Sequence, residues 1–594
     1  MRSLLLLAPA LVALAAGCSA PRPTLSENPA HRTPLTLDIP GPEASEDADA
    51  NPFLDYRLSV VFTHAETRET YIVPGFYAAD GQAADTSASA GPLWRVRFTP
   101  TEPGLWQWRA NFRTGPNVAL DFTEEGQPAP FDNATGEFTA APAPAHARGF
   151  LRWHREHYLR FDDGRYFLKG GADSPENFLA YFEFDGTTDT ATHADVQSDD
   201  AQFLHRFEPH AVDWREGDPT WQGNKGKNII GALNYLASAG MNSVYFLTYN
   251  LDGGDGQDVW PWTTPQERRR FDVSKLAQWE RVFTHMDRLG LMLHVVLQET
   301  ENDTKLGGDA TLNPVRMLYL RELIARFAHH PALVWNLGEE SNLTPPQAAA
   351  MAAFIRDLDP YDHPIAIHTK NRRALEIYDP LLGLPLFEAT SIQGDMDAAN
   401  DETIKLRVAS RLAGRPWVIF HDEQAPAAVG VAPDSVDPTH DAPRKQELWG
   451  NLMGGGAGVE WYFGYDHPHT DLNAEDWRSR EQMWAQTRIA LDFFHEYLPF
   501  WEMWPANELV QARGALCLAA EGRLYAVYLP NGGSTRIALP DGQFQIRWFN
   551  PRTGGALQIG SIETLERGGK PSLGQPPADP DQDWVVLITR PDNL

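Results

Sequence analysis

The chain has 594 residues, too many for one hydrophobic core, so we expect two to four domains. Hydrophobic residues make up 42% and charged residues 22%, as in globular proteins. The 80 acidic and 50 basic residues give a formal net charge of −30. A surface this negative repels phosphate backbones and disfavours a nucleic-acid partner.

The first residues have the pattern of an export signal. Arg2 precedes an apolar run that ends at Ala16 and is too short to span a bilayer. The adjoining "LAAGC" resembles the lipobox of bacterial lipoproteins, which implies a signal peptide over residues 1–18 and lipidation at Cys18. Ser19 then favours the outer membrane, with the protein in the bacterial cell envelope, periplasmic or surface-exposed. The alternative is an ordinary cleaved signal with a chance cysteine.

The next segments differ in composition. Residues 19–50 are rich in Pro, Ala and acidic side chains, which predicts a flexible tether. Residues 51–146 carry short alternating strands such as "YRLSVVFTH" and "LWRVRFTP", separated by turn signals, which predict a β-sandwich. Cys517 is the only cysteine besides Cys18, so we expect no intramolecular disulfide in the mature chain.

Residues 149–501 alternate apolar strand-like runs with helical segments. One helix is expected from Val273, with Asp272 as its cap and Gly290 as its stop, and another from Pro314. Eight such strands with crossover helices predict a (β/α)8 TIM barrel, with a doubly wound sheet as the alternative. The runs are "YFLKGGA", "NSVYFLTY", "LMLHVVLQ", "ALVWNLG", "PIAIHT", "FEATSIQ", "PWVIFHD" and "GVEWYFGY".

Residues 508–594 return to strands. The runs "LYAVYLP", "FQIRWFN" and "DWVVLITR" are separated by the hairpin signals "NGG" and "PRTGG". We therefore expect a small C-terminal β-sandwich domain, which makes the whole chain multidomain.

A TIM barrel places functional groups at the carboxyl ends of its strands, which gives a short list of candidates. Glutamates that end strands four and seven meet across the barrel mouth, where two carboxyls about 5–5.5 Å apart suit retaining glycoside hydrolysis. The candidates from strands three to eight are Gln298, Glu299, Glu301, Asn336, Glu339, Glu340, His368, Gln393, His421, Asp422, Glu423, Trp461 and Tyr462. Because neighbours on a strand face opposite ways, we expect only one of Asp422 and Glu423 to point inward.

Two of these segments resemble the clan-A type of retaining (β/α)8 glycoside hydrolase. "WNLGEES" is similar to that clan's Trp-x-x-x-Asn-Glu pattern and "RPWVIFHDEQ" to its strand-seven pattern. The resemblance implies Glu340 as acid/base and Glu423 as nucleophile. "VPGFYAADG", "DGGDGQDVWPW" and "WFNPRTGG" look like a bacterial group that joins an immunoglobulin-like domain of unassigned function, such a barrel, and a putative collagen-binding-type β-domain.

One position departs from the clan pattern. Glu339 stands where the clan keeps an asparagine that holds the sugar 2-hydroxyl. A second carboxylate beside the acid raises one pKa of the pair, which leaves Glu339 as the alternative acid/base. Asp422 is likewise the alternative nucleophile.

The remaining candidates are weaker. His294 is expected as a satisfied interior histidine, whereas His368 and His421 could orient a carboxylate or bind a hydroxyl. Trp260, Trp262 and Trp461 could stack on sugar rings or simply pack. Asp252, Asp255 and Asp258 lack the spacing of a calcium loop, so a polar loop is favoured and no metal site is assigned.

These features favour a lipid-anchored glycoside hydrolase that acts on a polysaccharide or oligosaccharide by a retaining mechanism and needs no cofactor. The alternative is a surface polysaccharide-binding lipoprotein with a catalytically inactive barrel. Sugar specificity, endo or exo action and oligomeric state stay open, because one fold hosts many specificities.

Overall fold

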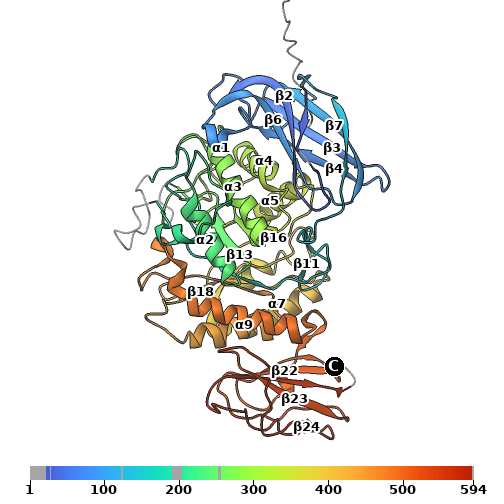
Figure 1. Ribbon diagram of the computed structural model, residues 1–594, viewed down its shortest axis with the longest axis vertical. Coiled ribbons are helices and arrows are strands. Elements are labelled where there is room, and N and C mark those ends of the chain that lie inside the picture. Colours follow the sequence, from blue (N-terminus) through green and yellow to red (C-terminus); the bar gives the residue numbers. More distant parts are fainter. Residues whose placement is uncertain are drawn as a thin grey trace, which may run out of the picture.

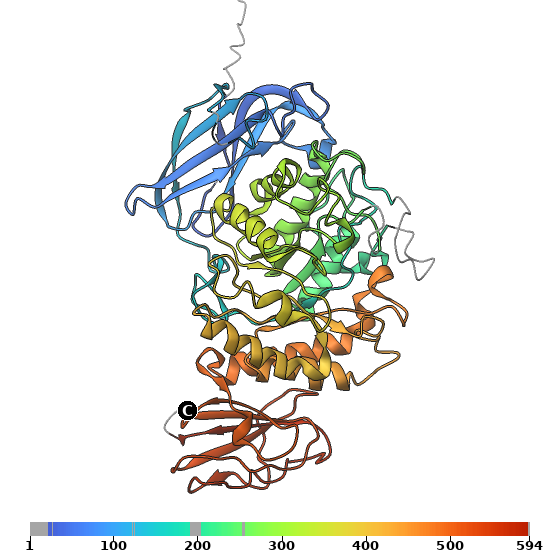
Figure 2. The ribbon, with the colours of Figure 1, turned by 180° about the vertical axis from the view of Figure 1, so that it is seen from behind.

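The computed structural model describes residues 22–26, 28–121, 123, 125–189, 204–251 and 256–591. Three β-containing regions follow one another along the longest axis of the molecule (Figure 1). An N-terminal β-sandwich lies at one end, a barrel in the middle and an antiparallel sheet at the other end. Figure 2 shows the same order from behind, with helix α9 between the barrel and the C-terminal sheet.

The N-terminal sandwich consists of two antiparallel sheets. One has the strand order β1-β2-β6-β5 and the other β4-β3-β7-β8, with β9 also on β7. The bounds are β1 Thr24–Leu25, β2 Leu35–Ser45, β3 Tyr56–His64, β4 Thr70–Pro74, β5 Phe76–Tyr77, β6 Ala90–Phe98, β7 Gly104–Thr114, β8 Gln127–Pro128 and β9 Thr135–Ala140, with the short helix α1 Ala83–Thr86.

The predicted tether over residues 19–50 is wrong for its second half. Strand β2 pairs with β6 along most of its length, and its Leu35, Leu37 and Ile39 are buried in the core between the sheets. The alternation of these three apolar residues with polar ones is the strand signal. The Pro- and acid-rich composition around it concealed that signal. Cys18 lies outside the described residues.

The barrel is a ring of eight parallel strands in the order β16-β15-β14-β13-β12-β19-β18-β17. A parallel bridge between His368 and Ser391 joins the two ends and closes the ring. Each predicted run contributes one strand: β12 Lys169–Ala172, β13 Ser243–Leu247, β14 Met292–Val296, β15 Leu333–Asn336, β16 Ile365–Ala366, β17 Ile392–Asp395, β18 His421–Ala425 and β19 Gly458–Trp461.

The two predicted barrel helices begin at the expected residues, and the first also ends where expected. The carboxylate of Asp272 accepts the Lys275 amide at the start of α3, and Gly290 ends it with φ of 77°. Pro314 takes the first position of α4, whose cap is Asn313. The helices are α2 Lys227–Ser238, α3 Val273–Leu289, α4 Pro314–Phe327, α5 Pro345–Leu358, α6 Ala374–Tyr378, α7 Ala399–Leu412, α8 Trp449–Met453 and α9 Glu481–Tyr497, with a π-helical turn Pro443–Leu448 before α8.

The amino end of the barrel is covered by a hairpin of β10 Leu151–Trp153 and β11 Leu159–Phe161. The Leu151 amide donates to the carbonyl of Pro331, and the Trp153 indole donates to that of Pro416; both prolines precede barrel strands. Access to the barrel interior is therefore from its carboxyl end, where the candidate residues lie.

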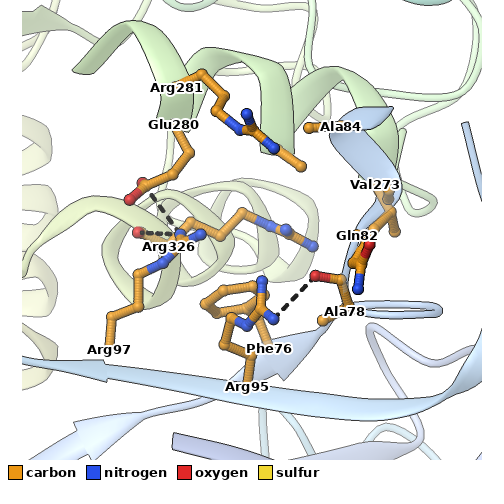
Figure 3. A pocket seen from close by; sticks show the side chains of 13 residues that line it. Phe76, Ala78, Gln82, Ala84, Arg95, Arg97, Val273, Glu280, Arg281 and Arg326 are labelled. Atoms are coloured by element: carbon orange, nitrogen blue, oxygen red, sulfur yellow. Dashed lines mark hydrogen bonds and ion pairs between the residues drawn. The ribbon is translucent and has the colours of Figure 1, made fainter. Parts of the chain in front are cut away.

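The sandwich is attached to the barrel through buried charges. Arg97 of β6 reaches Glu280 of α3 at 3.0 Å, and Figure 3 shows these two side chains and Arg326 of α4 converging beside a small cavity. His329 and His330 contact the same Glu280 carboxylate at 3.0 and 3.3 Å. This network lies beside the barrel helices, away from the mouth.

The C-terminal domain is an antiparallel sheet in the order β20-β21-β22-β25-β23-β24 with its own apolar core. Two aromatic contacts join it to the barrel helices: Trp449 stacks on Tyr528, and Phe493 packs against Phe549 with the rings tilted. The strands are β20 Trp504–Pro505, β21 Leu516–Ala520, β22 Leu524–Leu529, β23 Phe544–Phe549, β24 Thr564–Leu565 and β25 Trp584–Thr589. Within the described residues, no helix is long and apolar enough to cross a bilayer.

Candidate active site

Glu340 and Glu423 come from strands three places apart in the ring and meet over the barrel mouth. Gln393 of β17 lies between them, and its Nε2 donates to Glu340 Oε1 at 2.8 Å and to Glu423 Oε2 at 2.5 Å. The amide oxygen of Gln393 accepts the backbone N–H of Asn371, which fixes the orientation of the side chain. One amide group therefore holds both carboxylates.

A second link joins Glu423 to Glu339. His368 Nε2 lies 3.1 Å from Glu339 Oε1 and 3.3 Å from Glu423 Oε2. Its Nδ1 lies 3.0 Å from Ser391 Oγ. Burial, opposed by the charges of Asp422 and Glu340, lowers the pKa of His368 to about 4, so this imidazole is neutral near pH 7.

Burial also dominates the titration of the glutamates. It raises the pKa of Glu423 to about 7, against the Gln393 hydrogen bond, which lowers it. Burial together with the charges of Glu423 and Glu340 raises the pKa of Glu339 well above its usual value. A carboxyl that holds its proton near neutral pH can act as a general acid.

The backbone at Glu340 is unusual. Its φ of 37° lies in the left-handed region, which costs a non-glycine residue about 1–3 kcal/mol. Glu339 is 3% exposed, whereas Glu340 is only partly buried. The strained turn after β15 thus directs Glu339 into the barrel and leaves Glu340 at the rim.

A layer of buried polar groups lies beneath these residues. Lys169 Nζ contacts both Asp422 and Glu460, and Glu460 accepts from His294 Nδ1 at 2.7 Å. His294 is thus the satisfied interior histidine that we expected. Asn336 Nδ2 lies 3.1 Å from His294 Nε2. The predicted substrate-binding role of Asn336 does not fit, because its amide is engaged inside the barrel.

The expectation that only one of Asp422 and Glu423 points inward is wrong. Asp422 faces Lys169 in the interior, and Glu423 faces His368 and Gln393 at the mouth. The β17–β18 ladder shifts register between Ile392 and Gln393, and this irregularity accompanies the break in simple alternation. Both carboxylates are therefore buried on the inner side.

Four candidate side chains are engaged by neighbouring residues. His421 contacts Glu447 and Thr403 in the helix layer, at 2.9 and 3.1 Å. The Trp461 indole donates to Thr487 of α9, because its neighbour Glu460 takes the inward position. Trp260 is buried with its ring 4.5 Å from Lys275 Nζ of α3, and the buried Trp262 packs on Tyr249.

Two other predictions concern the loops. Glu299 lies after β14, where it is buried and accepts the Thr300 amide at 3.0 Å. Asp258 is buried, whereas Asp252 and Asp255 lie outside the described residues.

The structure adds three acids that the sequence reasoning did not select. Asp173 and Glu176 follow β12, and Asp471 lies in the loop after β19, where its Oδ1 accepts the Glu176 amide at 3.0 Å. Tyr462, a candidate from the eighth strand, follows β19. Burial and neighbouring acids raise the pKa of Asp173, Glu176 and Tyr462 well above their usual values. Asp173 could have been found by alternation from Lys169, whereas nothing in the local sequence marks Asp471.

Three groups of described residues bring metal-ligand atoms within 4.8 Å of one another. One of them, His294, Asp422 and Glu460, already surrounds the Lys169 amine, and another, Glu280 with His329 and His330, is paired with Arg97. The third is Glu339, His368 and Glu423 at the mouth. That group could hold a divalent cation, and its carboxyls can equally serve acid–base and nucleophilic chemistry.

Comparisons with known proteins agree with this architecture. Residues 31–113 match a family model described as "Domain of unknown function (DUF5060)" and residues 506–589 one described as "Putative collagen-binding domain of a collagenase". No curated protein sequence matches the chain significantly.

Solved structures show the same fold at low sequence identity. A protein from Bacteroides vulgatus described as a putative glycoside hydrolase is 15% identical, with a TM-score of 0.63, over 94% of this chain and 99% of that one. A second, described only as a glycoside hydrolase, is 12% identical over 75% and 98% of the two chains, with a TM-score of 0.53. A family 5 glycoside hydrolase from Bacteroides vulgatus is 14% identical over 75% and 94%, with a TM-score of 0.52.

Proposed function

We propose that this protein is a glycoside hydrolase that cleaves its substrate by retaining double displacement, with Glu423 as nucleophile and Glu340 as acid/base. The observation that carries the proposal is the shared Gln393 nitrogen. Its two hydrogen bonds of 2.8 and 2.5 Å keep the nearest oxygens of Glu340 and Glu423 within the sum of those distances. Retaining enzymes hold their carboxyls about 5–5.5 Å apart, whereas inverting enzymes need about 6.5–9.5 Å to admit a water.

The positions of the two glutamates suit different roles. Glu340 at the rim protonates the leaving oxygen, while the buried Glu423 carboxylate attacks the anomeric carbon. The Gln393 amide stabilises the Glu423 anion before attack. Glu340 then takes a proton from water, which displaces Glu423 from the sugar. Glu339, deeper than Glu340, contacts a ring hydroxyl in place of the clan's asparagine.

Two further observations support the proposal. Over 94% of its length, the chain has the fold of a solved protein that is described as a putative glycoside hydrolase. The strained backbone at Glu340 is also of the kind that persists at functional sites.

The test is hydrolysis of a panel of plant, algal and microbial glycans, followed by assay for new reducing ends. We expect one class to be cleaved, and Glu423→Ala to abolish that cleavage. Azide should then restore turnover of an activated glycoside as a glycosyl azide of opposite anomeric form. Full activity in Glu423→Ala would reject the assignment. Glycan binding with no release of reducing ends would favour the non-catalytic alternative.

We also propose that the chain is exported and anchored through Cys18. The support is the "LAAGC" pattern together with the preceding apolar run. Labelled palmitate should enter the wild-type protein in a bacterial host and be absent from Cys18→Ala. Equal labelling of the two proteins would contradict the anchor.

A further inference from the structure

Five buried carboxyls surround the floor of the barrel mouth, and we call them the acidic cluster: Asp173, Glu176, Glu339, Glu423 and Asp471. They come from the loop after β12, the loop after β15, strand β18 and the loop after β19. Each of the five residues is at most 8% exposed. The proposed reaction uses only Glu423 and, as a hydroxyl contact, Glu339, so three carboxyls have no role in it.

Asp173 shows most clearly that the cluster faces the site. Along β12, Lys169 points inward to Asp422, whereas a side chain at Gly170 would meet Thr487 and Leu491 of α9 on the outside. Alternation then directs Asp173, four residues after Lys169, to the inside. Asp173 is fully buried, and neither of its carboxylate oxygens has a hydrogen-bond partner. An orphaned buried carboxylate is costly unless a ligand satisfies it.

The cluster also lacks a compensating charge. Among the described residues, no Lys or Arg forms an ion pair with any of its five carboxyls. Of the basic side chains beside it, His368 is neutral near pH 7, and His205, which lies near Asp471, is paired with Glu475 at 2.9 Å. Lys169 is already shared between Asp422 and Glu460 in the layer below. Neighbouring like charges in a buried site can be relieved by protons or by a cation from outside.

The geometry argues against a single metal ion as that cation. In the described part of the chain, Asp173, Glu176 and Asp471 belong to no group of three residues whose ligand atoms lie within 4.8 Å of one another. The carboxylate oxygens of these three residues therefore lie too far apart to coordinate one metal ion together. A larger ligand with one positive charge and several hydroxyl donors can satisfy carboxylates that lie further apart.

We propose that the acidic cluster selects glycosides whose reacting sugar carries a free, protonated amine, with Asp173 as its main partner and Glu176 and Asp471 as hydroxyl acceptors. This inference rests on the proposed glycosidase function and names its substrate class, an amino-sugar glycoside. An N-acetylated sugar and a neutral sugar both lack the positive charge, so with either of them the like charges of the cluster can be relieved only by bound protons.

Binding of monosaccharides tests the inference without requiring turnover. Calorimetry or ligand-observed NMR would compare D-glucosamine, D-galactosamine and D-mannosamine with their neutral and N-acetylated counterparts on the intact chain. We expect at least one amine to bind about tenfold more tightly than both counterparts, because a charge-assisted hydrogen bond replaces a neutral one. Asp173→Asn and, independently, Asp471→Asn should reduce that preference, whereas Asp397→Asn, which removes an exposed charge beyond β17, should keep it.

Four outcomes would overturn the inference. They are equal affinity for the neutral or N-acetylated sugar, no binding of any amine, a preference that survives in a folded Asp173→Asn, and Ca²⁺ binding that depends on Asp173. Failure of this inference can be distinguished from failure of the proposed hydrolase function. Cleavage of neutral glycosides without amine preference rejects only the amino-sugar selectivity. Amine preference with no cleavage of any glycoside rejects only the hydrolase assignment.

Discussion

Glu340 and Glu423 accept hydrogen bonds from a single nitrogen, Nε2 of Gln393, although they end different strands of the barrel. Glu423 also approaches Glu339 through His368. Each glutamate of the strand-four pair therefore lies beside a side chain that also reaches the proposed nucleophile, Gln393 for Glu340 and His368 for Glu339.

The first prediction separates the two strand-four glutamates. Glu340→Gln should retain turnover of aryl glycosides with very good leaving groups and lose about 10²–10⁴-fold on poor ones, because only these need a proton. Glu339→Gln should slow both kinds alike, since it loses a contact to the sugar. Steady-state rates on a leaving-group series measure this, and the reverse pattern would identify Glu339 as the acid.

The second prediction concerns the pH profile. The nucleophile must be ionised, so kcat/KM should fall as pH drops through the Glu423 pKa of about 7. Gln393→Met removes the hydrogen bond that lowers this pKa, and the acid limb should move to higher pH. Gln446→Met, an exposed substitution near the mouth, is the matched control. An unmoved limb in Gln393→Met would show that this amide does not control Glu423.

The third prediction is that Glu423→Gln is more stable than the wild type at high pH but not at low pH. Burial raises the pKa of Glu423 from 4.5 to about 7, so the folded state binds this proton more tightly than the unfolded state. The resulting stabilisation is complete below pH 4.5 and is lost as pH rises to about 7. Glu423→Gln removes that loss, so its Tm should exceed that of the wild type at pH 8 but not at pH 4.5.

Thermal scans at several pH values measure this difference. Glu521→Gln, at an exposed turn of the C-terminal sheet, is the matched control for the change of glutamate to glutamine. A Tm difference between Glu423→Gln and the wild type that stays constant would mean that Glu423 does not titrate between the two pH values.

The fourth prediction concerns the junction of the sandwich and the barrel. Arg97→Met leaves the buried Glu280 without its guanidinium partner, and we expect a loss of about 3–5 kcal/mol in the free energy of unfolding. Arg165→Met, which removes an exposed pair with Asp163, should cost about 0–1 kcal/mol. Denaturant titration of both variants tests the contrast, and equal losses would mean that the junction pair is effectively solvated.

Much of the barrel was predictable because its signals are local. Each apolar run became a strand, and the caps Asp272 and Gly290 appear at the ends of α3. Residue order also located Glu340 and Glu423 near strand ends, because each comes shortly after an apolar run. Strand β2 was missed, since a composition rich in Pro and acids outweighed the alternation of Leu35, Leu37 and Ile39.

By itself the sequence determined the order of strands and helices, since that order follows from hydrophobic periodicity. It also determined which glutamates lie at the carboxyl end of the barrel, since these follow the apolar runs that form the strands. Only the tertiary structure decided which side chains face the interior and which distant loops meet there. His421 and Trp461 face outward because their neighbours Asp422 and Glu460 occupy the inside of the ring. Asp471 joins Glu176 although 295 residues separate them, because closure of the ring places the last strand beside the first.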